Sequence, residues 1–176
     1  MKSVIAIPFA RKLSGRTNYR RRLALLKSQA PRLIVRKTLG SIILQVAQFQ
    51  PIGDKIHLTV TSKRLKEFGW NHGFKNIPAA YLTGMLAAKV ALAAGMTNAV
   101  PDIGVQSVTK GGKIFAAIKG AKDAGLQTEV SDEILPAKEA INGTRLKLTA
   151  DFEKVKAAIA AWQPAPKGGK NAATKK

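Results

Sequence analysis

Basic side chains near the start of the chain are the residues best suited to chemistry, and that chemistry is the binding of phosphate. The segment GRTNYRRRLALLKS, residues 15–28, sets arginines and a lysine among leucines at helical spacing and contains no carboxylate. Tyr19, Leu23 and Leu26 share one face of the expected helix, which would hold it to the core or to a neighbour. Surface helices usually carry both signs of charge, so the missing acid favours a polyanionic partner over a merely solvated amphipathic helix.

The net charge follows the same pattern along the whole chain. The 176 residues include 30 Lys and Arg against 10 Asp and Glu, a formal charge of +20. Residues 1–53 hold 11 of these basic side chains and no acid, and residues 163–176 hold four lysines and no acid. The two ends therefore carry +15 of the +20. This distribution predicts a nucleic-acid-binding protein.

Residues for catalysis or metal binding form no recognisable group. Cysteine is absent, which excludes disulfides and thiolate ligands and is compatible with the cytoplasm. Asp102 is the only acid whose burial would need explaining, and a structural hydrogen bond or ion pair explains it better than catalysis. The segment KGGK, residues 110–113, opens a predicted helix and could offer backbone N–H groups and two lysines to a phosphate, but it lacks the spacing of a nucleotide-binding loop. We predict no enzyme activity, cofactor, metal or small-molecule substrate.

The elements that must position these residues alternate between strands and helices. Three β-branched-rich segments predict consecutive antiparallel strands, and later segments predict helices around one further strand. The strands are expected at 31–38, 41–49, 55–62 and 99–105, and the helices from Thr17 or Asn18 to Pro31 and at 76–95, 113–125 and 149–162, with a turn or short helix at 136–143. The expected fold is α/β, with a mixed sheet beginning with three antiparallel strands, packed helices, a basic N-terminal arm and a C-terminal helix and tail.

The domain organisation follows from the composition. We predict a basic, irregular arm over residues 1–16, a single α/β RNA-binding domain over 17–162 and a disordered basic tail over 163–176. The longest apolar stretch, residues 78–94, contains Lys89 and is shorter than a membrane span, so no membrane partner is expected.

Two segments suggest how RNA would be contacted. In the first strand, alternation puts Leu33 and Val35 on one face and Arg32 and Arg36 on the other, so that one face is partly cationic. The segment SKRLKEFGWNHGFKN, residues 62–76, interleaves basic and aromatic residues. Its rings could stack on unpaired bases, as in RNA-binding loops, or could anchor the loop to the core.

A family resemblance joins these segments. In order along residues 15–143, GRTNYRRRLALLKS, PRLIVRKT, FGW, KNIPAAYLTGMLAAK, DIGV, TKGGKIFAAIKGAKDAGL and EILP resemble the universal large-subunit ribosomal protein eighteen of the archaeal type, related to the eukaryotic large-subunit protein five. The resemblance implies a cytoplasmic, non-enzymatic constituent of the large ribosomal subunit. It would bind 5S rRNA, contact 23S rRNA and lie beside other ribosomal proteins of the central protuberance.

The resemblance also implies particular contacts. The family's RNA-contacting motifs fall on Arg16, Tyr19, Arg20, Arg21, Arg22, Arg32, Arg36, Lys37, Lys75, Asn76, Lys110 and Lys113. The charge pattern adds Arg11, Lys12, Lys27, Lys63 and Arg64. The competing hypothesis is a general nucleic-acid-binding or architectural protein, for which the two basic ends would suffice. A third hypothesis, an RNA-modifying enzyme, requires a pocket near Asp102.

Overall fold

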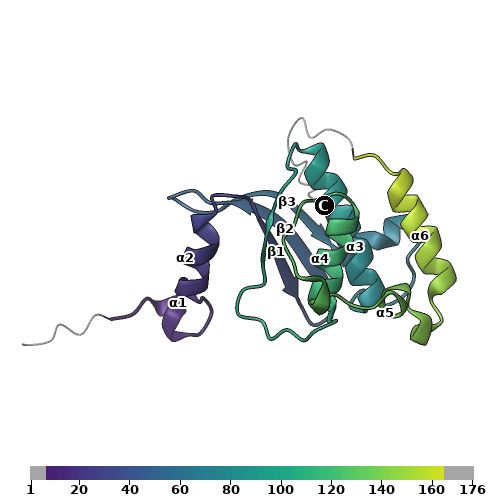
Figure 1. Ribbon diagram of the computed structural model, residues 1–176, viewed down its shortest axis with the longest axis horizontal. Coiled ribbons are helices and arrows are strands. Elements are labelled where there is room, and N and C mark those ends of the chain that lie inside the picture. The colour runs from purple at the N-terminus through teal and green to yellow at the C-terminus, as the bar shows by residue number, and fades with distance from the viewer. Residues whose placement is uncertain (1–6, 165–176) are drawn as a thin grey trace, which may run out of the picture.

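A computed structural model describes residues 7–164 of the chain (Figure 1). A four-stranded sheet has the helices α3 and α4 on one side, while the first two helices lie on the other side, apart from the remaining helices. The helices are α1 (Ala10–Leu13), α2 (Tyr19–Lys27), α3 (Ile77–Ala93), α4 (Lys113–Asp123), α5 (Lys138–Asn142) and α6 (Thr149–Ala161), with 3-10 turns η1 (Ser62–Phe68), η2 (Asp132–Ile134) and η3 (Thr144–Leu146).

The sheet has the mixed topology that the sequence predicts. Strands β1 (Arg32–Lys37), β2 (Ile42–Gln48) and β3 (Lys55–Thr61) pair antiparallel, and β4 (Val100–Asp102) runs parallel to β1. The strand order is β3-β2-β1-β4. Leu33 and Val35 are fully buried beneath the helices, which confirms the predicted alternation. The opposite face of β1 carries Arg32 and Arg36.

Helices α3 and α4 pack at unusually close range because glycines lie where they cross. A Cβ added at Gly84 of α3 would lie 2.0 Å from the carbonyl oxygen of Ala117, and one added at Gly120 of α4 would lie 2.0 Å from that of Tyr81. Side chains larger than hydrogen would therefore push the two backbones apart. The small residues of the predicted helix 76–95 are explained by this contact.

The last helix belongs to the same core. Phe152, Val155 and Ile159 of α6 are buried in it. Lys89, the lone charge of α3, extends its ammonium group to the carbonyl oxygens of Ala160 and Trp162 at the end of α6. A cation at this end of a helix satisfies unpaired carbonyls and interacts favourably with the helix dipole.

Three predicted segments differ from the structure. The expected strand 99–105 is only three residues long, because Gly104 turns the chain at φ +67° while its N–H donates to Asp102 Oδ1. The arm, expected to be irregular, contains the short helix α1. Residues 62–68 form η1, which Gly69 ends in the left-handed region. Of the predicted tail, residues 165–176 lie outside the described residues.

Candidate nucleic-acid interface

Helix α2 carries the densest group of predicted RNA contacts, and none of its residues is buried. Asn18 begins the helix, because its Oδ1 accepts a hydrogen bond from the backbone N–H of Arg21 at 3.1 Å. The ring of Tyr19 lies 5.3 Å from that of Phe9, centroid to centroid, so this tyrosine contacts the preceding segment. On the predicted apolar face, Leu26 is half-buried whereas Leu23 is 61% exposed, so Leu23 is the residue left for contact with a neighbour.

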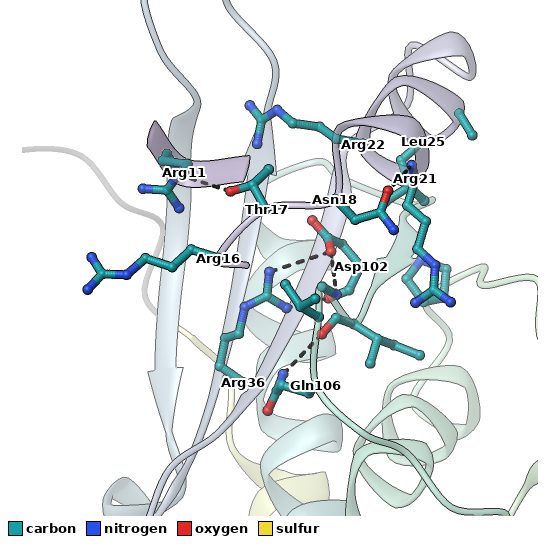
Figure 2. A pocket seen from close by; sticks show the side chains of 15 residues that line it. Arg11, Arg16, Thr17, Asn18, Arg21, Arg22, Leu25, Arg36, Asp102 and Gln106 are labelled. Carbon is teal, nitrogen blue, oxygen red and sulfur yellow. Dashed lines mark hydrogen bonds and ion pairs between the residues drawn. The ribbon is translucent and has the colours of Figure 1, made fainter. Parts of the chain in front are cut away.

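A cavity of about 660 Å³ separates α2 and the arm from the segment that follows β4 (Figure 2). Its walls include apolar groups of Leu25, Pro101, Ile103 and Val105. Five arginines line it, namely Arg11, Arg16, Arg21, Arg22 and Arg36. Arginine binds phosphate through several N–H donors in a fixed plane, so a concave surface with five of them is suited to an RNA backbone.

At this cavity, arginines and aspartates alternate in a chain of ion pairs, and Arg22, Arg36 and Asp102 of this chain line the cavity. Both carboxylate oxygens of Asp54 accept from Nη2 of Arg22, at 3.0 and 2.9 Å. Nη2 of Arg32 lies 2.7 Å from Asp54 Oδ2, and its Nη1 donates to Asp102 Oδ2 at 3.1 Å. Arg36 donates to the Asp102 carbonyl oxygen at 2.9 Å. We call these five residues the arginine–aspartate chain.

The position of Arg32 requires a correction. Its side chain is 1% exposed and is enclosed between the two carboxylates, so it has no surface to offer to RNA in this structure. Burying a guanidinium without a partner would be costly, and the two aspartates compensate its charge. We therefore remove Arg32 from the predicted interface. Arg22 and Arg36, at the two ends of the arginine–aspartate chain, keep about a third of their side-chain surface exposed.

Asp54 is held in its charged form by these arginines. Burial by itself would raise its pKa, but the hydrogen bonds from Arg32 and Arg22, together with their positive charges, outweigh that effect and lower the pKa below its ordinary value. Asp102 is 7% exposed and interacts with Arg32 and Arg36. Its predicted structural ion pair is therefore confirmed.

A second cavity, of about 490 Å³, lies at the start of α4 and is lined by four lysines and by no acid. The lysines are Lys37, Lys75, Lys110 and Lys113. Gly112 is the N-cap residue of α4, and Gly111 adopts φ +67°, which favours glycine. Lys37 ends β1 directly after Arg36, so the last two residues of this strand each line one of the two cavities. The structure thus brings together lysines that are up to 76 positions apart in sequence.

Some of the remaining predicted residues are exposed, and others already interact with groups of the same chain. Lys12, Arg20, Lys27 and Lys63 are exposed. Arg64 forms an ion pair with Glu67 at 3.1 Å and lies over the Trp162 ring, 5.3 Å from its centroid. The side-chain oxygen of Asn76 accepts from the N–H of Ala79 at 2.8 Å. Asn76 is therefore the N-cap of α3, and its amide nitrogen is left to contact RNA.

The aromatic rings of residues 62–76 favour the core alternative over base stacking. Trp70 is fully buried, and its Nε1 donates to the carbonyl oxygen of Gly73 at 3.3 Å. Phe68 packs edge-on against Trp162, and Phe74 packs against the hydrophobic core. These rings anchor the segment instead of presenting flat faces to unpaired bases.

Two residues that shape the interface were not among the predicted ones. Asp54 connects α2 to the sheet, and Gln106 fixes the segment after β4 by accepting from the Lys37 N–H at 2.7 Å and donating to the Val35 carbonyl at 2.8 Å. Asp54 had a signal, since it is the first acid after 53 residues without one. Gln106 had none, because a lone glutamine in a loop carries no pattern.

Within residues 7–164, no group of three or more His, Asp or Glu side chains is arranged to hold a metal ion. No helix in the same range has the length and apolar character needed to cross a membrane.

Comparison with known proteins identifies the family. The model of the family described as "Ribosomal large subunit proteins 60S L5, and 50S L18" matches residues 5–100. The chain belongs to this family. The large ribosomal subunit protein uL18 of Korarchaeum cryptofilum is 46% identical over 145 residues, which is 82% of this chain and 74% of the relative. The uL18 proteins of Staphylothermus marinus and Desulfurococcus amylolyticus are 45% and 48% identical, over 80% and 85% of this chain and 70% and 75% of theirs.

Membership confirms the resemblance and the non-enzymatic prediction. A member of this family is a structural constituent of the large ribosomal subunit, of the archaeal uL18 type, and its surroundings are rRNA and other ribosomal proteins. The hypothesis of an RNA-modifying enzyme required a pocket near Asp102, and Asp102 does line the first cavity. Family membership sets this hypothesis aside, and the Asp102 carboxylate is paired with two arginines.

Proposed function

We propose that this chain binds 5S rRNA and helps anchor it to 23S rRNA in the central protuberance of the large subunit. The two cavities supply the contacts, with arginines of the arm and α2 in the first and lysines around the start of α4 in the second. Neighbouring ribosomal proteins of the central protuberance are proposed as further partners.

The observation that carries the proposal is the convergence of nine basic side chains on two cavities. Five arginines line the first cavity and four lysines line the second, although they come from the arm, α2, β1 and two later segments. Convergence from several elements is expected of an interface, and Lys75, Lys110 and Lys113 lie outside the two basic ends, which would need no folded surface if they acted alone. Phosphate contacts of this kind fix the position and register of a protein on RNA.

A salt titration of binding to 5S rRNA, with a transfer RNA as the comparison, tests the proposal. If about six phosphates are neutralised, the logarithm of the binding constant should fall with a slope near −4 against the logarithm of salt, using roughly 0.7 per phosphate. A preference of at least about tenfold for 5S rRNA, equivalent to about 1.4 kcal/mol, supports specific recognition.

Paired substitutions locate the contacts. Arg16→Gln with Arg21→Gln, and separately Lys110→Gln with Lys113→Gln, should each weaken 5S binding and flatten the slope by about 1.4. Lys147→Gln with Lys154→Gln removes the same charge from positions that line neither cavity and should leave the slope nearly unchanged. Equal binding of both RNAs at every salt concentration would favour the general nucleic-acid-binding alternative, which the concentration of charge at the two ends also supports.

We also propose that residues 17–162 act as one domain. The buried side chains of α6 lie in the same core as those of α3 and α4, which supports the boundary at residue 162. The tail that was predicted to begin at residue 163 is then dispensable for folding.

A further inference from the structure

Apart from the half-buried side chains of Leu25 and Leu26, the arm and α2 are joined to the rest of the described chain by one ion pair. Within residues 7–164, the Arg22–Asp54 interaction is the only side-chain hydrogen bond or salt bridge that links residues 7–30 to any later residue. The Phe9–Tyr19 and Arg11–Thr17 contacts lie inside the segment. No residue of α1 or α2 is buried. The position of α2 therefore depends on Asp54 far more than a core helix depends on any one side chain.

The helix is also too short to be stable by itself. It spans nine residues, and isolated helices below about 12 residues are marginal in water. Four of the nine side chains are cationic and none is acidic, so their mutual repulsion is not relieved within the helix. A contact that supplies a fixed negative charge should both hold the helix in place and favour its folded form.

Asp54 is well placed to supply that charge. It lies immediately before β3, and Arg32 on its other side is anchored by Asp102. The carboxylate is thus built into the sheet, while its two oxygens face α2 through Arg22. The same interaction sets how α2 faces the segment after β4, and these two walls enclose the first cavity (Figure 2).

We propose that Asp54 is a positioning residue for RNA recognition, which fixes the arginines of α2 in the arrangement that rRNA binds. This inference rests on the proposed function of α2 and adds to it a residue that does not contact phosphate. If charge alone mattered, removing a negative charge beside an RNA-binding surface should strengthen RNA binding. If Asp54 positions α2, removing its charge should instead weaken specific binding.

The test compares the full-length chain with its Asp54→Asn variant. In the free protein, the amide hydrogens of α2 should exchange with solvent at least about tenfold faster in the variant, since the helix loses its attachment. Affinity for 5S rRNA should fall about tenfold, because the binding arrangement is no longer preorganised. Transfer RNA, bound by charge alone, should bind as well as before or slightly better. Asp54→Glu, which keeps the charge, should recover part of both losses.

Two matched controls separate position from charge. Glu133→Gln makes the same change of charge at an exposed residue that lines neither cavity and should alter neither α2 exchange nor 5S affinity. Arg22→Gln cuts the attachment but leaves the Arg32–Asp54 pair intact, so it serves as the test if Asp54→Asn does not fold. Its control, Arg20→Gln, removes an exposed charge from the same helix and should flatten the salt slope without speeding α2 exchange.

The outcomes are decisive in both directions. Unchanged α2 exchange in Asp54→Asn, or 5S affinity that is unchanged or increased, would overturn the positioning role. If the unmodified chain fails to prefer 5S rRNA, the proposed function fails instead. The positioning role is then decided by α2 exchange together with affinity for whichever RNA binds.

Discussion

Helices α2 and α3 begin with the same capping signal but differ in burial, since α2 lies at the surface and α3 lies in the core. Each begins at an asparagine whose side-chain oxygen caps the first turn, Asn18 for α2 and Asn76 for α3. None of the nine residues of α2 is buried, whereas 13 of the 17 residues of α3 are. The local start signal is therefore shared, and what differs is how each helix is held: α3 by extensive packing, and α2 by one ion pair and two half-buried leucines.

The difference assigns separate tasks to the two regions. Burial fixes α3 and α4 rigidly, so they set the geometry of the sheet and of the second cavity. Because α2 is held by a polar contact, its arginines stay exposed for RNA. The helix itself is then less stable than a buried helix. The comparison predicts that substitutions in α3 and α4 change folding, and that substitutions in α2 change RNA binding with little effect on folding.

The largest effect is expected at the crossing of α3 and α4. Gly120→Ala would place a methyl group 2.0 Å from the carbonyl oxygen of Tyr81, and separating the two backbones should reduce the free energy of unfolding by about 3 kcal/mol. Urea unfolding followed by circular dichroism measures it. Gly40→Ala, where nothing lies within 4 Å of the added carbon, is the control and should change stability by no more than about 0.5 kcal/mol. A small effect at Gly120 would mean that the two helices can move apart easily.

A smaller loss is expected at the end of α6. Lys89→Met keeps the aliphatic stem but removes the ammonium group from the Ala160 and Trp162 carbonyls, which should lower the unfolding free energy by about 1 kcal/mol. Thermal unfolding of this variant tests whether α6 belongs to the same cooperative unit. Truncation after residue 164 should leave the unfolding temperature unchanged. A separate, earlier transition for α6 would argue against one domain over residues 17–162.

The next largest effect is expected from acid, which should weaken the contact of Asp54 with Arg22 that holds α2. The pKa of Asp54 is lowered in the folded protein by Arg32 and Arg22, against the raising effect of burial. Its stabilising contribution is therefore complete above the unfolded value of about 3.9 and is lost as pH falls through the lower folded value. Exchange of α2 amides, corrected for the intrinsic rate, should rise below about pH 4 in the unmodified chain. In Asp54→Asn, exchange of the α2 amides should already be fast at neutral pH, and it should show no further increase below about pH 4.

The smallest effect on folding is expected within α2 itself. Arg20→Gln with Arg21→Gln should change the free energy of unfolding by less than about 0.5 kcal/mol, since both side chains are exposed. The same variant should lower the salt slope of RNA binding by about 1.4. A stability loss comparable to that of Gly120→Ala would show that α2 is part of the core after all, and the contrast between the two helices would fail.

Much of the architecture could be predicted because short-range patterns specify it. Alternating apolar residues located the three antiparallel strands, and the Asn, Pro and Gly signals located α3. Segments with weaker local signals were predicted less well. The strand 99–105 was shortened by the turn at Gly104, and η1 formed within residues 62–76, where basic and aromatic residues had suggested an open loop. In that segment the burial of Trp70 decided between core packing and base stacking, and burial depends on contacts with distant residues.

The sequence by itself determined that the chain is strongly basic at its ends, α/β in fold and similar to a ribosomal protein family, because charge, periodicity and ordered motifs are properties of a linear string. Only the tertiary structure decided which cations face outward. Arg32 and Arg36 alternate onto the same face of β1, yet Arg32 is enclosed by Asp54 and Asp102 whereas Arg36 reaches the first cavity. The physical reason is that a buried charge requires a partner, and the partners of Arg32 lie 22 and 70 residues away, immediately before β3 and in β4.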